Sequence, residues 1–468
     1  MQATTQTMIQ CISPIDGSVY VERPIATPEQ IQACFQASRT AQANWKRLSI
    51  QERAKYCHAA VDALLNMKTR IVDELAWQMG RPVSVGAGEL RGFEERARYM
   101  IELATTALAD LVPNPKTGFE RRILREPLGV VLTIAPWNYP FLTTVNSVIP
   151  ALMAGNTSVL KHAANTLLVA ERFQEAFDAA GLPQGVFQHL VLNHAQTAQV
   201  IANGLADMVC FTGSVAGGKA MEAAASGRFI PVGLELGGKD PAYVRADANL
   251  QHAIENLADG AFFNSGQSCC GIERIYAHEN VYNEVVAGIA KLGSQYKLGN
   301  PLNPTTNLGP MIKPASADFV RAQINQAIAA GAVAHVDTSE FELDQPGSAY
   351  LSPQVLSNVN HSMSVMLEES FGPVVGIMKV KDDAEAIRLM NDSPYGLTAA
   401  IWTEDVGAAE RMAAELQTGT VFMNRCDYLD PALAWTGVKD TGRGCTLSSI
   451  GYEALTRPKS LHFRLQTS

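Results

Sequence analysis

Short apolar runs alternate with helical patterns between residues 130 and 236, and this alternation constrains the fold more than any other feature. The runs occupy residues 130–135, 158–161, 186–192, 208–211 and 231–236. Strands that alternate with helices predict a parallel sheet covered by helices. Gly155 and Gly181 follow helical stretches, where a left-handed C-terminal cap is favoured. We therefore expect a Rossmann-like domain in this part of the chain.

A second alternation follows Cys269 and predicts another α/β domain. Helices are expected near 281–295, 315–330, 383–390 and 406–416, and strands at 374–380, 397–402 and 418–423. Helical patterns also fill much of 29–109. Residues 118–130 and 457–465 alternate charged with apolar side chains, which predicts two strands that could be exposed edges. The polar, acidic segment 337–347 is expected to be a surface loop.

Length, charge and cysteine spacing limit the possible functions. A chain of 468 residues predicts two or three domains. Its net charge of −9, without a run of lysines or arginines, argues against a nucleic-acid partner. No apolar stretch is long enough to span a membrane, and the first seven residues lack the features of a secretory signal. The eight scattered cysteines fit reduced thiols in a cytoplasmic protein, and their spacing predicts no metal site.

Two glycine-bearing motifs supply a candidate nucleophile and a candidate base. The first is Gly266-Gln267-Ser268-Cys269-Cys270-Gly271, and the second is Leu234-Glu235-Leu236-Gly237-Gly238-Lys239. A lone free cysteine more often packs as a small hydrophobe, and a lone glutamate is more often a polar strand end. Glycines around a thiol admit substrate, however, and a glutamate between apolar residues has a pKa open to tuning. Together the motifs indicate covalent catalysis followed by attack of an activated water.

With these motifs, several further segments resemble the NAD(P)-dependent aldehyde dehydrogenases over nearly the whole chain. The segments are Pro136-Trp137-Asn138-Tyr139-Pro140, Lys161, Phe211-Thr212-Gly213-Ser214 with Gly218, Glu368-Glu369-Ser370-Phe371-Gly372-Pro373 and Thr420-Val421-Phe422-Met423-Asn424, in the order that the family uses. The resemblance implies an α/β fold with a Rossmann-like cofactor domain, a second α/β catalytic domain and a small β oligomerisation element. It places these at residues 1–112 with 131–236, at 237–440, and at 113–130 with 455–468.

The resemblance also assigns catalytic roles. Cys269, rather than Cys270, becomes the nucleophile, and Glu235 lies 34 positions before it (269 minus 235), close to the family interval. A base that activates water implies the hydrolytic branch rather than acyl transfer to coenzyme A. Asn138 and the backbone N–H of Cys269 would stabilise the oxyanion formed on attack. Asn138 as a mere turn residue is the competing interpretation.

Ten residues are expected to contact a nicotinamide cofactor. They are Ile134, Pro136, Trp137, Lys161, Gly213, Ser214, Gly218, Leu236, Glu369 and Phe371. Gly213, Ser214 and Gly218 lie between a predicted strand and a predicted helix, where a helix N-terminus suits a diphosphate. Many members that prefer NAD carry a glutamate three positions after the lysine, where this chain has Ala164. We expect NAD as the cofactor, with NADP also accepted.

The substrate is expected to be a small-molecule aldehyde, and the candidate lining residues are Tyr139, Leu142, Asn146, Cys270 and Arg425. Arg425 would suit a carboxylated aldehyde such as succinic semialdehyde, which is the alternative to a simple aldehyde. A surface arginine paired with Asp427 or Asp430 is the competing interpretation of that residue.

Three other classes of function stay open at this point: an acylating enzyme that uses coenzyme A, a cysteine hydrolase, and a non-catalytic nucleotide-binding protein that retains the fold. The family uses segments equivalent to 118–130 and 457–465 to join subunits. The resemblance therefore implies a homodimer or homotetramer.

Overall fold

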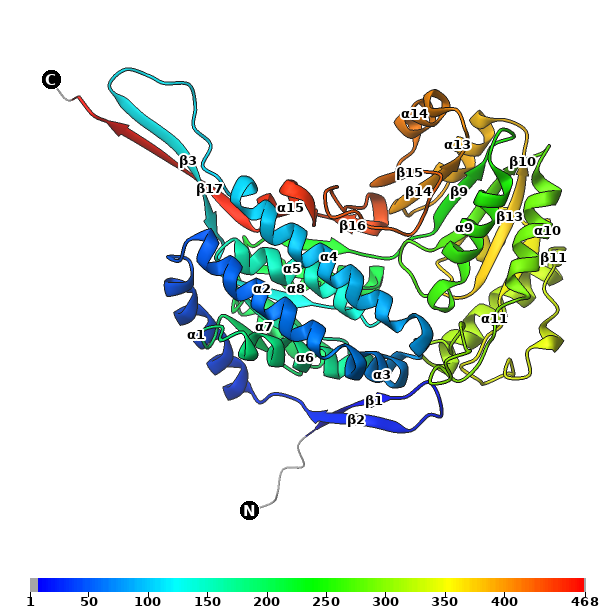
Figure 1. Ribbon diagram of the computed structural model, residues 1–468, viewed down its shortest axis with the longest axis horizontal. Helices are drawn as coiled ribbons and strands as arrows, with labels where there is room; N and C mark the ends of the chain where they lie inside the picture. Colours follow the sequence, from blue (N-terminus) through cyan, green and yellow to red (C-terminus); the bar gives the residue numbers. More distant parts are fainter. Residues whose placement is uncertain (1–6, 467–468) are drawn as a thin grey trace, which may run out of the picture.

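The computed structural model describes residues 7–466, in which two sheets lie side by side and a two-stranded arm extends from the first (Figure 1). The first sheet runs in the order β16-β8-β7-β4-β5-β6. Its strands are β4 (Val130–Ile134), β5 (Thr157–Lys161), β6 (Phe187–His189), β7 (Met208–Thr212), β8 (Val232–Glu235) and β16 (Gly442–Arg443). All neighbours are parallel except β16, which runs antiparallel to β8. The five apolar runs thus form the predicted parallel sheet.

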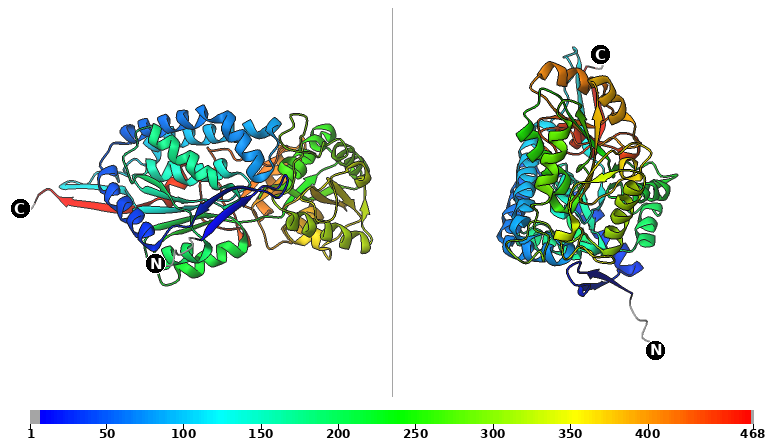
Figure 2. Two further views of the ribbon diagram at one scale, coloured as in Figure 1. Left: turned by 90° about the horizontal axis from the view of Figure 1, so that it is seen from below. Right: turned by 90° about the vertical axis from the view of Figure 1, so that its right-hand side faces the viewer.

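Helices cover both faces of this sheet (Figure 2). They are α1 (Pro28–Trp45), α2 (Ile50–Asn66), α3 (Lys68–Met79), α4 (Val83–Ala107), α5 (Pro140–Met153), α6 (Leu167–Ala179), α7 (His194–Ala202), α8 (Val215–Ala225) and α15 (Ser448–Ala454), with a short 3₁₀ turn η1 (Ala164–Thr166). Thr27 and Ser49 start α1 and α2 with capping boxes, which satisfy backbone N–H groups that a helix start leaves free. Trp45 anchors α1 by donating from Nε1 to the Leu152 carbonyl at 2.9 Å.

The second sheet has the order β11-β12-β13-β10-β9-β14-β15. Its strands are β9 (Asp240–Val244), β10 (Ile272–His278), β11 (Val333–Ala334), β12 (Gln354–Ser357), β13 (Val374–Val380), β14 (Thr398–Trp402) and β15 (Thr420–Met423). Its helices are α9 (Leu250–Phe262), α10 (Tyr282–Gly293), α11 (Pro314–Ala329), α12 (Ser364–Leu367), α13 (Asp383–Asn391) and α14 (Val406–Glu415), with 3₁₀ turns η2 (Phe263–Gly266), η3 (Thr338–Glu340) and η4 (Lys439–Thr441). The α/β fold class predicted from the sequence is confirmed.

This second alternation begins earlier than the sequence pattern indicates, with β9 and α9 before Cys269. Proline within β9 and charges within β10 hide both strands from an apolar pattern. The β10 residues Glu273 and Arg274 are buried because tertiary partners satisfy them. Glu273 accepts from Lys239 Nζ at 2.5 Å, and Arg274 Nε donates to the Lys239 carbonyl at 2.9 Å.

Two antiparallel pairs lie outside these sheets. β3 (Phe119–Pro127) and β17 (Thr456–Arg464) form the arm, with Phe119 opposite Arg464 and Thr456 opposite Pro127. The arm extends away from the body (Figures 1 and 2). The sequence predicted both of its strands but not the hairpin β1 (Met8–Ile12) and β2 (Val19–Pro24), whose exposed faces weaken the apolar signal. Tyr350, near the second sheet, donates from its hydroxyl to the Ile15 carbonyl in that hairpin at 3.4 Å.

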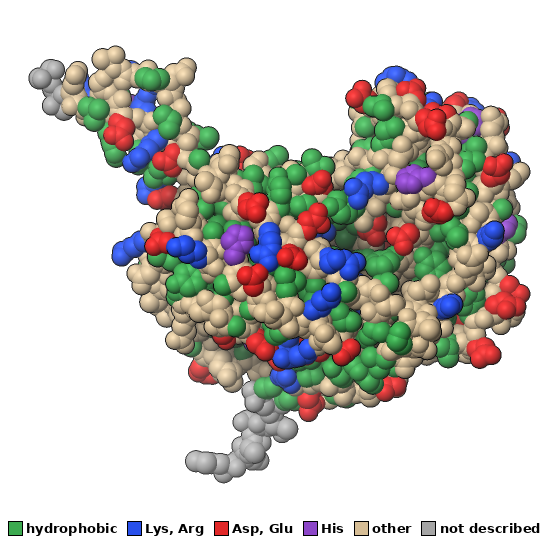
Figure 3. Space-filling view, in the orientation of Figure 1, with side chains coloured by type: hydrophobic (Ala, Val, Ile, Leu, Met, Phe, Trp, Pro, Cys, Tyr) green, Lys and Arg blue, Asp and Glu red, His purple; other side chains and the backbone are tan. Residues whose placement is uncertain are grey.

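The surface carries interspersed charged side chains of both signs, without a large basic patch on the face shown in Figure 3. Segment 337–347 is mostly loop, and its Asp344 accepts from Arg321 Nη2 at 2.9 Å. No helix within residues 7–466 is long and apolar enough to cross a membrane. Residues 1–6, on which most of the expectation about a signal segment depends, lie outside the described residues.

Candidate active site

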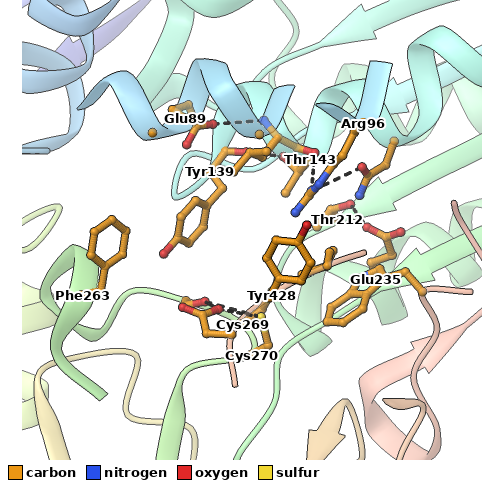
Figure 4. Close-up of a pocket in the computed structure, with 18 of the residues that line it drawn as sticks. Glu89, Arg96, Tyr139, Thr143, Thr212, Glu235, Phe263, Cys269, Cys270 and Tyr428 are labelled. Atoms are coloured by element: carbon orange, nitrogen blue, oxygen red, sulfur yellow. Dashed lines mark hydrogen bonds between the residues drawn. The ribbon is translucent and has the colours of Figure 1, made fainter. Parts of the chain in front are cut away.

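Two cavities meet at Cys269 and Glu235, between the two sheets. The first, the α4 cavity, has a volume of about 550 Å³ and is lined on one side by α4 (Figure 4). The second, the α8 pocket, has a volume of about 180 Å³ and lies beside the start of α8. Cys269, Glu235, Thr212 and Leu236 line both cavities. A thiol and a carboxylate thus stand at the junction of two separate binding spaces.

A tight loop after α9 presents Cys269. Asn264, Ser265 and Gly266 have φ angles of 54°, 56° and 68°, so the chain reverses within η2. A side chain at Gly266 would lie 2.2 Å from the Gly372 carbonyl oxygen, so this position requires glycine. Gln267 then ties the loop to the neighbouring segment, because its Oε1 accepts from the Ile312 N–H at 2.8 Å.

The neighbouring thiol, Cys270, is more deeply buried than Cys269. Its Sγ donates to Asp427 Oδ1 at 2.9 Å, and the Ser268 hydroxyl donates to the same oxygen at 2.9 Å. The hydrogen bond to Cys269 and burial raise the pKa of Cys270 well above its usual value. Cys270 is therefore held as a protonated thiol.

Asn138 follows β4 and reaches the cysteine loop. Its Nδ2 donates to the Gln267 carbonyl at 3.2 Å, and only 5% of the residue is exposed. Its own carbonyl accepts from Arg81 Nη2 at 2.6 Å and from Asn264 Nδ2 at 3.2 Å. These bonds fix the asparagine amide beside the backbone of the loop that carries Cys269.

Glu235 is the last residue of β8. Thr212 donates to its Oε2 at 2.9 Å, and Thr446 donates to its Oε1 at 2.5 Å. Burial raises the pKa of Glu235, whereas the two threonine hydrogen bonds lower it. The carboxylate is held in place by both threonines, and its pKa is shifted toward neutrality, as suits a general base.

Seven of the ten predicted cofactor residues line the α8 pocket: Pro136, Trp137, Gly213, Ser214, Leu236, Glu369 and Phe371. Ser214 caps α8 by accepting from the Gly217 N–H at 3.2 Å. Glu369 accepts from the Gly238 N–H at 3.0 Å, and burial raises its pKa to about 7. The Trp137 and Phe371 rings meet edge to face, with centroids 5.7 Å apart.

The other three predicted cofactor residues lie outside the lining of this pocket. Gly218 packs against Leu236, where an added side chain would come within 2.7 Å. Ile134 pairs with Lys161 across β4 and β5. Lys161 is buried without an ion pair to any described residue, and burial lowers its pKa. Ala164 is exposed just beyond the end of β5, so no carboxylate occupies that position.

Four of the five predicted substrate residues line the α4 cavity: Tyr139, Leu142, Asn146 and Cys270. Arg425 does not. It is exposed and stacks on the Tyr428 ring at 3.8 Å. Neither of its proposed acidic partners pairs with it, since Asp427 accepts from Ser268 and Cys270, and Asp430 accepts from the Ala432 N–H at 2.9 Å.

Sequence reasoning missed the charged residues that α4 and the segment before it bring to the cavity. Arg81 and Glu89 form a fully buried ion pair, and Glu89 also accepts from the Phe141 and Leu142 N–H groups at 2.9 and 3.0 Å. Arg96 follows Glu89 by seven positions, two helical turns along the same face. A charged residue on the face that buries Phe93 and Met100 is the signal that would have found it.

Within residues 7–466 no group of three or more histidine, cysteine, aspartate or glutamate side chains is arranged to hold a metal ion.

Comparisons with known proteins agree with this geometry. Residues 1–461 match the family described as the aldehyde dehydrogenase family. The chain is 35% identical to a 4,4'-diapolycopene aldehyde oxidase of Methylomonas sp over 94% of this chain and 82% of that protein. It is 32% identical to a succinate-semialdehyde dehydrogenase [NADP(+)] of Deinococcus radiodurans over 96% of this chain and 93% of that protein. A betaine aldehyde dehydrogenase structure from Staphylococcus aureus, in complex with NAD+, superposes with a TM-score of 0.92 at 27% identity, covering 99% of this chain and 92% of that one.

Proposed function

The chain belongs to the aldehyde dehydrogenase family, and from that premise we propose that Cys269 and Glu235 oxidise an aldehyde to a carboxylic acid by a hydrolytic, NAD(P)-dependent route. One observation carries the proposal: both side chains line the α4 cavity and the α8 pocket. A nucleophile that holds the aldehyde carbon must face the substrate on one side and the hydride acceptor on the other. A residue at the junction of two binding spaces meets that requirement.

The reaction begins when the Cys269 thiolate adds to the aldehyde carbon. The carbonyl oxygen becomes an oxyanion, which accepts hydrogen bonds from Asn138 Nδ2 and from the Cys269 backbone N–H. Cys270 does not compete, because its thiol is held protonated by its partners. The nicotinamide cofactor, when bound, accepts the hydride that leaves the thiohemiacetal carbon.

Loss of hydride leaves a thioester on Cys269, which water must hydrolyse. Glu235 takes a proton from that water, and the resulting hydroxide attacks the thioester carbon. The C–S bond then breaks, which releases the carboxylic acid and restores the thiolate. The net change consumes one aldehyde, one oxidised cofactor and one water, and yields one acid, one reduced cofactor and a proton.

The residues around the α8 pocket fit a nicotinamide dinucleotide. The start of α8, capped by Ser214, offers backbone N–H groups to a diphosphate. Glu369 and Phe371 would orient the nicotinamide ribose and ring, and Lys161 would meet the adenosine ribose. Lys161 has no acidic partner among the described residues, and Ala164 puts no negative charge nearby. Neither residue would repel a 2′-phosphate, and we propose that the chain uses NAD and also accepts NADP.

The experiment that tests this function follows reduced nicotinamide with a panel of aliphatic, aromatic and carboxylated aldehydes. Native protein is compared with Cys269→Ala and with Cys270→Ala as the matched control. Turnover is expected to vanish in the first variant and to persist in the second. No turnover of any aldehyde by folded native protein would contradict the proposal. Product formation that requires added coenzyme A would favour the acylating route.

We also propose that the arm formed by β3 and β17 joins copies of this chain into a homodimer or homotetramer. It extends from the body, and β17 has β3 as its strand partner among the described residues, which leaves its other edge uncovered. Such edges are usually covered. Light scattering on native protein and on a chain lacking residues 456–468 tests this, with loss of the assembly expected in the shortened chain. A monomeric native protein would contradict it.

The eight free thiols favour a cytoplasmic location.

A further inference from the structure

Arg96 is a buried guanidinium that no carboxylate neutralises directly. It projects from α4 into the α4 cavity (Figure 4), and 8% of the residue is exposed. Its Nη1 donates to the Leu142 carbonyl at 2.8 Å and to Asn146 Oδ1 at 3.4 Å. Its Nε and Nη2 make no hydrogen bond to any residue in 7–466, and no ion pair includes it. Buried charges are normally paired, so Arg96 has unused capacity to bind an anion.

Asn146 adds a second unused donor at the same place. It projects from α5, only 2% of the residue is exposed, and it lines the same cavity. While its Oδ1 accepts from Arg96, its Nδ2 is buried without a partner among the described residues. An unsatisfied buried donor is costly, which indicates that a ligand or water completes it. Gly92 allows this meeting of α4 and α5, because a side chain there would lie 2.5 Å from Leu142.

Four of the five acidic side chains that line the cavity have hydrogen-bond or ion-pair partners. Arg81 pairs with Glu89, and the Tyr428 hydroxyl donates to Glu95 at 2.7 Å. Ser268 and Cys270 hold Asp427, two threonines hold Glu235, and Asp259 is exposed. None of these carboxylates forms an ion pair with Arg96, so its positive charge is directed at the contents of the cavity.

We propose that Arg96 and Asn146 bind the carboxylate of a carboxylated aldehyde whose other end, the aldehyde, reaches Cys269 in the same cavity. The two free guanidinium N–H directions and the asparagine amide match the acceptor oxygens of a carboxylate. The inference rests on the proposed function and assigns its substrate class. It transfers the role expected of Arg425 to a residue inside the cavity.

A purely structural role for Arg96 is the competing explanation, since its bond to the Leu142 carbonyl joins α4 to α5. Loss of that bond would lower turnover of every aldehyde alike. Arg96 also acts on Glu235, because its charge lowers the pKa of that carboxyl. This effect too is shared by all substrates. A carboxylate site changes the ratio between substrates, and the ratio is what the test must measure.

The test compares kcat/KM for a semialdehyde that carries a terminal carboxylate with kcat/KM for the unsubstituted aldehyde of equal chain length. The variants are Arg96→Met, Arg96→Lys and Asn146→Ala, with Arg98→Met as the matched control. Arg98 lies on the same helix but pairs with Asp62 and Glu94 at the surface. Thermal unfolding of each variant checks that it folds.

Native protein is expected to prefer the carboxylated aldehyde. Arg96→Met should lower the ratio of the two kcat/KM values by roughly 10- to 100-fold, the range for a lost charge-assisted hydrogen-bond pair. Arg96→Lys should retain part of the preference, since lysine keeps the positive charge but lacks the planar guanidinium that can bind both carboxylate oxygens. Arg98→Met should retain all of it.

An equal fall for both aldehydes in Arg96→Met would overturn the inference and leave Arg96 a structural residue. A native enzyme that oxidises the neutral aldehyde as well as the carboxylated one would overturn it too, although the proposed function would stand. Oxidation of neither aldehyde would defeat the proposed function itself. If Arg96→Met does not fold, Asn146→Ala and Arg96→Lys decide the question by the same ratio.

Discussion

The α8 pocket and the α4 cavity share Cys269 and Glu235, but the chain builds them in different ways. The pocket is assembled mainly from residues at or just after the ends of β4, β7 and β8, which stand within short motifs such as Gly213-Ser214. The cavity takes residues from α4, from α5 and from the segment after β15, which lie far apart in the sequence. A binding space built from strand ends can be identified from motifs, whereas one built from packed helix faces depends on which side chains the packing turns inward.

The largest effect is expected from Glu235→Gln, which should separate hydride transfer from thioester hydrolysis. Hydride transfer should survive, because it needs Cys269 and the α8 pocket, while hydrolysis loses its base. We expect a burst of reduced cofactor equal to the enzyme concentration, then steady turnover lowered by roughly 10²- to 10⁴-fold. Stopped-flow absorbance measures both phases. Absence of the burst would place Glu235 before hydride transfer, and Cys269→Ala supplies the burst-free reference.

Asn138→Ala tests the amide donor that lines the α8 pocket beside the cysteine loop. The variant should lower kcat by roughly 10²- to 10³-fold, because one of two fixed donors to the oxyanion is removed. Cofactor affinity should stay within a few-fold of native, as Asn138 would contact the oxyanion rather than the dinucleotide. Steady-state rates with fluorescence titration of the cofactor measure the two effects. A fall below tenfold would mean that Asn138 serves the turn alone.

Ala164→Glu tests whether residue 164 affects the choice between NAD and NADP. A carboxylate at this exposed position should repel a 2′-phosphate and lower kcat/KM for NADP by roughly 10- to 100-fold, with a smaller change for NAD. Ala164→Gln, which adds the same bulk without charge, is the matched control. Equal losses with both cofactors would show that the adenosine ribose lies elsewhere.

The smallest expected effect comes from removing the hydrogen bond that Thr446 donates to Glu235. Thr446→Val removes a hydrogen bond that lowers the Glu235 pKa, so that pKa should rise further. Because the base must be ionised, hydrolysis is lost as pH falls through this pKa, and the acid limb of kcat should move to higher pH. We expect a loss of roughly two- to tenfold on the acid limb that alkaline pH restores.

A pH profile of steady-state kcat checks this shift. Thr436→Val is the control, since Thr436 donates to the Gly444 carbonyl at 2.6 Å and does not contact Glu235. An unshifted acid limb in Thr446→Val would refute the role of that hydrogen bond.

The sequence was sufficient for the parallel sheet and for the residues at its strand ends. The run at β4 is almost continuously apolar because both faces of this inner strand are buried, whereas β8 alternates buried with half-buried residues. It failed at β9 and β10, where a proline and paired charges interrupt the pattern. Glu273 is buried because Lys239 and the Ser370 and Phe371 N–H groups satisfy it, contacts between residues 34 or more positions apart that no local pattern reveals.

The sequence by itself therefore determined the family, the sheet and the motifs that carry Cys269, Glu235 and Asn138. Local patterns fix these features, because strand burial and glycine-rich turns leave a signal within a few residues. Only the tertiary structure decided that Arg96 faces the α4 cavity and that Arg425 does not. Arg425 stands beside a family motif yet is exposed on Tyr428, whereas Arg96 is turned inward where α4 packs on α5. The direction of a long side chain is set by the packing of elements distant in sequence, and no motif records it.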